Sequence, residues 1–266
     1  MPDLPTFLTT HPRSILVEIS RAQGSTPREA GTLMLVSETA NWGTIGGGQF
    51  EFMAIANARD MLAGGGRETM DIPLGPEIGQ CCGGRTELLF RPLTPELARE
   101  IEQRLTAEAQ ERPQVHIFGA GHVGRALVAA LAPLPVATTV IETRREELAT
   151  LPAGTKTRLA AMPEALVADM PPGAAAVILT HDHALDFLIA REALARGDLA
   201  YVGMIGSATK RATFAHWLAR EGDGKVAVER LTLPIGGATV KDKRPEVIAA
   251  MTAAELLMAF STYRRR

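Results

Sequence analysis

Cysteine is scarce in this chain of 266 residues: the only two, Cys81 and Cys82, are neighbours. Adjacent cysteines could close only a strained eight-membered ring and would join no distant parts of the chain, so a disulfide framework is excluded. Unpaired thiols stay reduced in the cytoplasm, and we therefore expect a cytoplasmic protein.

Long hydrophobic runs are lacking, and so is a basic leader at the N-terminus. No stretch approaches the roughly 18 uninterrupted apolar residues that a membrane span needs. The first residues, MPDLPTFLTTHPRS, show no charged start followed by an apolar core of signal-peptide length. We therefore expect neither a membrane segment nor a secretory signal.

An excess of charge of one sign is missing as well. Lys and Arg number 28 against 30 Asp and Glu, and these charges are spread along the chain. Nucleic-acid binding rests on many clustered cations that neutralise phosphates, so this function class is excluded. A hydrophobic fraction of 46% and a charged fraction of 22% indicate a globular protein with one large domain or two small ones.

Residues 1–93 predict a small α+β domain. Two apolar runs, Ser14–Ser20 and Thr32–Ser37, are separated by turn-forming residues and predict an antiparallel pair of strands. The segment that follows has apolar residues at helical spacing and predicts a helix ending at the glycines 64–66. A further strand is predicted over residues 85–93.

Residues 94–112 predict a charged helical connector, and residues 113–266 predict a Rossmann-like domain. From Gln114 onward, short apolar strands alternate with helical segments, as in a parallel sheet covered by helices. The last run, Pro245–Tyr263, is apolar nearly all round and predicts a buried closing helix. The expected fold class is α/β: a C-terminal Rossmann-like parallel sheet domain preceded by a small α+β domain.

A glycine fingerprint follows the first strand of the predicted C-terminal domain. Gly119, Gly121 and Gly124 have the spacing GxGxxG, His122 lies inside the motif, and Glu142 ends the next strand. The first glycine allows a tight turn, the second lets a phosphate approach, the third lets helix and strand pack, and the acid meets a ribose hydroxyl. The motif predicts a Rossmann fold but leaves the ligand open between NAD(P) and another phosphate-bearing molecule.

A second glycine cluster, Gly46, Gly47 and Gly48, comes directly before a predicted helix. Its amides can form an anion-binding concavity at the helix N-terminus. The alternative is a sharp turn without a ligand.

The two cysteines are predicted to lie on a glycine-rich bend between strands. This bend consists of Gln80, Cys81, Cys82, Gly83, Gly84 and Arg85. The cation of Arg85 favours a thiolate, and thiolates are soft ligands for a metal or for a transferred sulfur. The alternative is two small residues filling a turn.

Polar residues follow the buried strand that ends near residue 179. Thr180, His181, Asp182 and His183 come in sequence, with Asp186 after them. They fall short of the hydrolase metal pattern HxHxDH, so a catalytic metal is disfavoured. Thr180 and Asp182 are instead predicted to cap the next helix, with the imidazoles lining a ligand pocket.

A third strand–helix junction combines glycine, a hydroxyl group and cations. Gly206 and Ser207 follow a predicted strand, and Lys210 and Arg211 lie near the start of the next helix. This combination suits a phosphate.

Taken together, the motifs resemble the XdhC/CoxI family. The segments GTIGGGQFE, GQCCGGRTELLF, VHIFGAGHVGRAL, THDHALDFLIAREAL, YVGMIGSATKRATF and LTLPIGG occur in the order and at about the spacing of that family. The QCCGG form is similar to its xanthine dehydrogenase accessory branch. The resemblance implies a homodimeric chaperone of the molybdenum cofactor (molybdopterin), not an enzyme. Such a protein holds the cofactor while a cysteine desulfurase supplies its sulfido ligand, then passes it to apo xanthine dehydrogenase.

The resemblance also implies roles for particular residues. Cys81 and Cys82 become candidate contacts to molybdenum or its sulfido ligand, and the glycine clusters become candidate seats of the pterin phosphate. Two departures are Glu142, where the family often has aspartate, and the polar segment after Gly237. Two other functions stay open: an NAD(P)-dependent oxidoreductase, with His183 as its best proton donor, and an assembly factor that acts only by binding protein.

Overall fold

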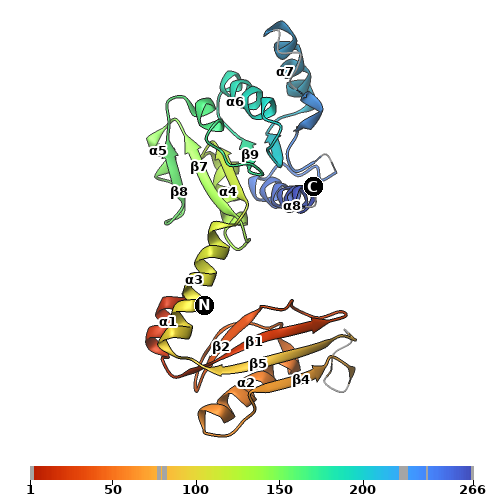
Figure 1. The fold of residues 1–266 in the computed structure, drawn as a ribbon. Helices are drawn as coiled ribbons and strands as arrows, with labels where there is room; N and C mark the ends of the chain where they lie inside the picture. Colours follow the sequence, from red (N-terminus) through yellow and green to blue (C-terminus); the bar gives the residue numbers. More distant parts are fainter. Residues whose placement is uncertain (1–2, 77–78, 80–82, 222–226, 238, 265–266) are drawn as a thin grey trace. The chain divides into compact units, whose positions relative to one another are not determined.

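A computed structural model describes residues 3–76, 79, 83–221, 227–237 and 239–264. The chain divides into two compact units, Met1–Ala107 and Glu108–Arg266 (Figure 1). Within the described ranges, no helix is both long enough and apolar enough to cross a membrane. The expected fold class is confirmed, because one unit holds an antiparallel sheet with helices and the other a parallel sheet.

The first unit is built on a five-stranded antiparallel sheet in the order β3-β2-β1-β5-β4. Its elements are α1 (Leu4–Thr10), β1 (Ser14–Gln23), β2 (Leu33–Ser37), β3 (Asn41–Gly43), α2 (Gly48–Leu62), β4 (Thr69–Pro73), β5 (Arg85–Pro92) and α3 (Pro95–Gln110). The predicted strand pair is confirmed, since Ser14 of β1 lies opposite Ser37 of β2. The strand expected before the predicted cysteine bend is β4, whose bounds were not predicted because Ile72 is its only buried residue.

Helices cover both faces of this sheet. The buried side chains of α2 recur every four residues, from Phe50 through Ala54 and Ala58 to Leu62, and pack against one face. The other face packs against α1 and against the part of α3 that contains Leu97 and Ile101. Neighbouring residues of β1 and β2 point to opposite faces, since Val17 and Met34 pack with α2 whereas Leu16 and Leu35 pack with α1 and α3. A sheet covered on both sides requires such apolar residues on both faces.

The second unit is built on a six-stranded parallel sheet in the order β11-β10-β9-β6-β7-β8. Its strands are β6 (Gln114–Phe118), β7 (Ala137–Glu142), β8 (Lys156–Leu159), β9 (Ala175–Ile178), β10 (Tyr201–Met204) and β11 (Leu231–Thr232). Its helices are α4 (His122–Leu131), α5 (Arg145–Leu148), α6 (His183–Ala195), α7 (Ala208–Glu221) and α8 (Pro245–Tyr263), with short 3₁₀ turns at Pro163–Val167 and Val228–Arg230.

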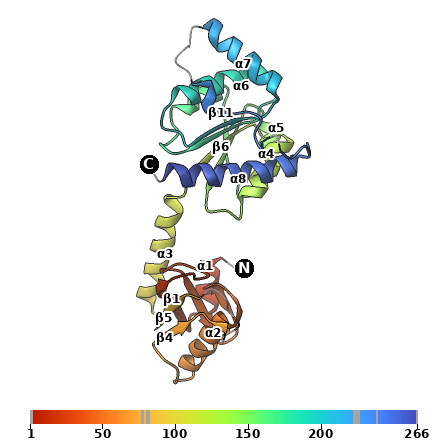
Figure 2. The same cartoon turned by 90° about the vertical axis from the view of Figure 1, so that its right-hand side faces the viewer.

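Two hydrophobic clusters fill the two faces of this sheet. One packs α4 and α8 against it, and the other packs α6 and α7 on the opposite side (Figures 1 and 2). The prediction that α8 is buried all round is wrong: Leu256 and Phe260 are buried, but Leu257 is 40% and Met258 63% exposed. The helix is apolar on both sides, yet the sheet covers only one of them.

The charge of Glu255 within α8 has a partner on the sheet. The hydroxyl of Tyr201 in β10 donates to Glu255 Oε2 over 2.7 Å. Burial, followed by the neighbouring carboxylate, raises the pKa of Tyr201 above its usual value, so the phenol stays protonated and keeps donating. This bond ties α8 to β10, the strand next to the β11 edge of the sheet.

The strand order fixes where a ligand can bind. The chain starts in the middle of the sheet at β6, adds β7 and β8 on one side, then crosses to β9, β10 and β11 on the other. The topological switch point therefore lies between β6 and β9. In open α/β sheets, ligands bind beyond the carboxyl ends of the strands at this point.

Candidate functional site

Three of the predicted clusters come together at the carboxyl edge of the parallel sheet. Gly119–Gly124 follows β6, Thr180–His183 follows β9, and Gly206–Lys210 follows β10. Because β6, β9 and β10 are consecutive neighbours and run parallel, the loops after them share one edge. The clusters of residues 46–48 and 80–85 belong to the first unit.

Two glycines of the fingerprint, Gly119 and Gly124, allow the close backbone packing that the motif predicts. Gly119 has φ +118°, and a Cβ there would lie 2.4 Å from the carbonyl oxygen of Leu179 at the end of β9. A Cβ on Gly124 would lie 2.2 Å from the carbonyl oxygen of Gly119, so only glycine lets α4 begin this close to its strand. A Cβ on Gly121 would meet nothing within 4 Å. The middle glycine thus faces open space.

Unused donors gather at the start of α4. Among the described residues, the amides of Gly121, His122, Val123 and Gly124 donate to no acceptor. Free amides at a helix N-terminus, together with the helix dipole, favour an anion. These amides could therefore hold an anion beside the open space at Gly121.

The carboxylate of Glu142 has its partners inside the protein. One oxygen accepts from the amide of Ala120 over 2.9 Å, and the other accepts from the amide of Thr143 over 2.9 Å. Further donors are the hydroxyl of Thr143 and the amide and guanidinium of Arg144. Because a carboxylate offers about four acceptor positions, these donors already fill it. The ribose contact predicted for Glu142 stays a prediction, while the structure gives this side chain the task of holding the glycine loop.

Glu142 is expected to make the unit more stable above acidic pH. Burial raises the pKa of this carboxyl group, but the hydrogen bonds from Ala120, Arg144 and Thr143 outweigh it and leave the pKa below 4.5. A lowered folded-state pKa adds stability that is fully present above about pH 4.5 and is lost as the pH falls through the folded value. We expect Glu142→Gln to lower the unfolding free energy by about 1–3 kcal/mol at pH 7.

Urea unfolding at pH 7 and at pH 3 measures this contribution. The difference between the wild type and Glu142→Gln should shrink at pH 3, because the stabilisation from a lowered folded-state pKa declines below the ordinary pKa of about 4.5. The exposed neighbour Glu146, changed to Gln, serves as the matched control and should show little difference. Equal destabilisation at both pH values would contradict the charge-based role.

A buried ion pair joins the loops after β9 and β10. Asp186 is fully buried, and its Oδ2 lies 2.5 Å from Nζ of Lys210. The other oxygen accepts from the amide of Thr180 over 3.0 Å and lies 2.6 Å from its hydroxyl. Lys210 also donates to the carbonyl of Ile205 over 3.0 Å. The phosphate contact predicted for Lys210 stays a prediction, but its ammonium group already has internal acceptors.

The predicted capping role of Asp182 is confirmed. Asp182 is the N-cap of α6, and its Oδ1 accepts from the amide of Ala184 over 2.8 Å. His181 and His183 are exposed. Within the part of the chain that the structure describes, no group of three or more histidine, cysteine or carboxylate side chains could hold a metal ion.

The turn that contains Gly46–Gly48 binds a carboxylate of the protein, that of Glu51. Glu51 Oε2, in the first turn of α2, accepts from the amide of Ile45 over 3.0 Å and from that of Gly47 over 3.1 Å. The hydroxyl of Thr44 donates to the same oxygen over 2.5 Å. The structure thus favours the turn without a ligand over the anion-binding concavity, and the cofactor contact predicted for these glycines stays untested.

The cysteine bend lies partly outside the described residues: Gln80, Cys81 and Cys82 belong to the gaps. Beside them, a Cβ on Gly84 would lie 2.2 Å from the carbonyl oxygen of Ser25, so this glycine lets two backbones touch. Arg85 forms an exposed ion pair with Asp71, with N–O distances of 2.6 and 2.7 Å. Its charge is therefore shared with a carboxylate and is not reserved for a thiolate.

One feature of the carboxyl edge was not predicted as a site. A cavity of about 360 Å³ lies beyond β10 and β11 and beside the first turns of α8. Of the predicted residues it contains only Gly206, whereas Lys241, Asp242 and Lys243 line it from the loop before α8. The unusual polarity of this loop after Gly237 was a sequence signal, but no site was predicted from it.

The fold defines the class of protein: a Rossmann-type unit attached to an α+β unit. Residues 115–256 match the model of the XdhC Rossmann domain, and residues 9–73 match that of the XdhC and CoxI family. The chain therefore belongs to the XdhC/CoxI family.

Two known proteins are similar to most of this chain. It is 27% identical over 260 residues to the uncharacterized protein YqeB of Escherichia coli (strain K12), covering 91% of this chain but only 42% of that protein. The crystal structure of a protein from Bacillus halodurans, described as a xanthine dehydrogenase, superimposes with a TM-score of 0.79. The two are 18% identical, and the match covers 97% of this chain and 95% of the other. This likeness shows a shared fold.

Proposed function

We propose that this protein is a chaperone of the molybdenum cofactor. It binds the cofactor, protects it while a cysteine desulfurase supplies the sulfido ligand, and delivers it to apo xanthine dehydrogenase; it catalyses no reaction of its own. The observation that carries the proposal is family membership, with XdhC matches in both units of the chain. The cofactor is the cargo of the protein, and a homodimer is the form in which we expect it to act.

The chemistry of the carboxyl edge supports this proposal. The molybdenum cofactor is anionic at both ends, with a phosphate at one and the molybdenum–dithiolene group at the other. Amides at the start of α4 have no acceptor among the described residues and can donate to such a group. Backbone donors hold an anion without adding a permanent ligand, so the cargo can leave again. Cys81 and Cys82 are proposed as the exchangeable soft contacts.

The alternative is an NAD(P)-dependent oxidoreductase. The geometry of Gly119 and Gly124 favours it, since both pack as in dinucleotide-binding folds. The carboxylate that would bind the adenosine ribose, Glu142, already has a full set of donors. The chaperone is therefore the better supported of the two functions. A protein that assembles the enzyme through protein contacts alone is the remaining alternative.

Cofactor retention tests the proposal. The purified protein is mixed with molybdenum cofactor, freed of unbound ligand on a sizing column, and assayed for pterin fluorescence after oxidation, with NADH in a parallel sample. We expect near-stoichiometric pterin and no NADH. Saturable NADH binding without retained pterin would contradict the chaperone and support the oxidoreductase. Retention of neither ligand, together with tight binding to the apoenzyme, would support the factor that acts only by binding protein.

The cysteine assignment has its own test. Cys81→Ser together with Cys82→Ser should reduce the amount of bound cofactor or its sulfuration. Unchanged amount and sulfuration would remove the cysteines from the site while leaving the chaperone function in place.

A further inference from the structure

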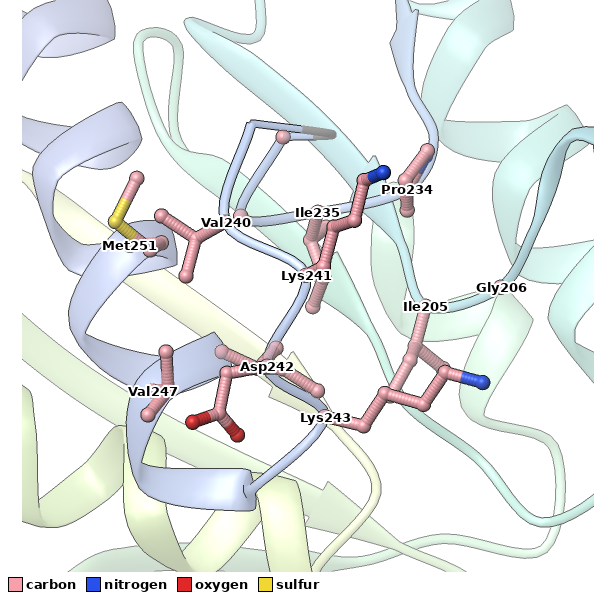
Figure 3. Close-up of a pocket in the computed structure, with 13 residues that line it drawn as sticks. Ile205, Gly206, Pro234, Ile235, Val240, Lys241, Asp242, Lys243, Val247 and Met251 are labelled. Carbon is pink, nitrogen blue, oxygen red and sulfur yellow. The ribbon is translucent and has the colours of Figure 1, made fainter.

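The cavity beyond β10 and β11 has a charged rim. Lys241 and Lys243 line it and are exposed, and neither forms an ion pair with any residue in the described ranges. In Figure 3 the amino group of Lys241 points toward Pro234, and that of Lys243 toward the side where Ile205 and Gly206 lie. Two unpaired ammonium groups at one cavity favour an anion.

The carboxylate between the two lysines is already neutralised. Asp242 accepts from the guanidinium of Arg244 over 2.6 and 2.9 Å and from the amide of the same residue over 2.9 Å. In Figure 3 its carboxylate points away from both lysine amino groups. The pair Asp242–Arg244 is thus internally balanced, and the positive charge of the rim comes from the lysines.

Backbone donors lie on the side of the cavity formed by the loop after β11. Gly236 and Gly237 line it with φ values of +75° and +70°, a left-handed conformation that glycine adopts readily. Their amides donate to no acceptor within the described part of the chain. A phosphate, with its several acceptor oxygens, can take up both lysine and amide donors.

The rest of the cavity is apolar. Its wall comes from Ile205 and Ile235 at the strand ends and from Val247, Ile248 and Met251 on α8. A volume of about 360 Å³ falls in the range of small-molecule sites, roughly 300–1,000 Å³. The cavity can therefore hold the carbon skeleton of a ligand as well as its charge, which the exposed start of α4 alone does not offer.

The half of the carboxyl edge on the β7 side of the switch point is less available to a nucleotide. A Rossmann sheet binds one nucleotide on each side of the switch point. On the β7 side, Glu142 is occupied by Ala120, Thr143 and Arg144. On the β10–β11 side, the two lysines and the amides of Gly236 and Gly237 have no such partners among the residues that the structure describes. The asymmetry favours a ligand carrying a single phosphate-bearing arm over a dinucleotide.

We infer that this cavity binds a flat organic phosphate, with the phosphate on Lys241, Lys243 and the amides of Gly236 and Gly237 and the carbon ring system against the wall of α8. The inference rests on the proposed function in one respect: it assigns this position to the phosphate-bearing end of the pterin cargo. The start of α4 is left for the other anionic end.

A metal-free probe tests the cavity separately from the chaperone function. The probe is the fluorescent oxidised pterin obtained from molybdopterin, used with its phosphate and after removal of the phosphate by phosphatase. Fluorescence anisotropy should show that the wild type binds the phosphorylated pterin about tenfold or more tightly than the dephosphorylated one. The preference should weaken with added salt, because the lysines are exposed.

Two double variants complete the test. In Lys241→Gln with Lys243→Gln the preference for the phosphorylated pterin should disappear. Lys156→Gln with Arg220→Gln removes the same charge from exposed positions elsewhere in this unit and should keep the preference. A preference that survives in the first variant, is lost equally in both, or is absent from the wild type would overturn the inference.

The outcomes separate this inference from the proposed function. Retention of intact cofactor without any lysine-dependent phosphate preference would refute the cavity and leave the chaperone standing. A lysine-dependent preference in a protein that does not retain the intact cofactor would refute the chaperone and leave an organophosphate site.

Discussion

Replacing Asp186 with alanine is expected to lower the unfolding free energy of the second unit by about 3–5 kcal/mol. Asp186 is fully buried, and the side chain of Lys210 is only 10% exposed, so removal of the carboxylate leaves an ammonium group in a poorly solvated place. The amide of Thr180 loses its acceptor at the same time, while the hydroxyl of Thr180 keeps the carbonyl of Asp182 as an alternative acceptor. Each unsatisfied buried group adds to the cost.

The size of the loss can be assigned to the ion pair by a double-variant cycle. Asp186→Leu together with Lys210→Met replaces both charges by apolar groups and should cost less than the sum of the two single changes. Urea unfolding followed by circular dichroism gives the three free energies. Additive losses would mean that the two residues stabilise the unit independently, which the 2.5 Å contact does not predict.

The fold class could be predicted because both units repeat simple patterns. The first half of β1 and nearly all of β2 are buried apolar runs, and the alternation of strand and helix after Gln114 identified the parallel sheet. The strand β8 escaped prediction, since all four of its residues, Lys156–Leu159, are exposed at the edge of the sheet. A segment that is held mainly by backbone hydrogen bonds has no hydrophobic pattern to reveal it.

The candidate site was harder to predict than the fold. A glycine-rich turn before a helix looks the same whether its amides face a ligand or a side chain of the protein. Only the structure separates the amides near Gly47, which donate to Glu51, from those at Gly121, which have no acceptor among the described residues. The cavity was hidden for another reason: Gly206, Lys241 and Met251 come from separate segments that meet only after folding.

The two glycines Gly121 and Gly124 are expected to separate cargo binding from stability. Gly124→Ala should destabilise the unit by about 1–3 kcal/mol, because its Cβ would lie 2.2 Å from the carbonyl oxygen of Gly119 and must push the loop away from α4. Gly121→Asp should leave stability equal to the wild type or slightly higher. The backbone there has φ −66°, nothing lies within 4 Å of the new Cβ, and aspartate is a favoured N-cap.

Cofactor retention should follow a different order from stability. The carboxylate of Gly121→Asp would occupy the free amides of α4 and repel an anion, so retained pterin should fall about tenfold, a loss of about 1.4 kcal/mol. Gly121→Asn has the same shape without the charge and should lose less.

Thermal unfolding, measured beside pterin retention, shows whether each variant is folded. A folded Gly121→Asp that retains as much cofactor as the wild type would exclude the glycine loop from the site. A stable variant that has lost its cargo, three residues from an unstable one, is explained by an anion bound at these amides.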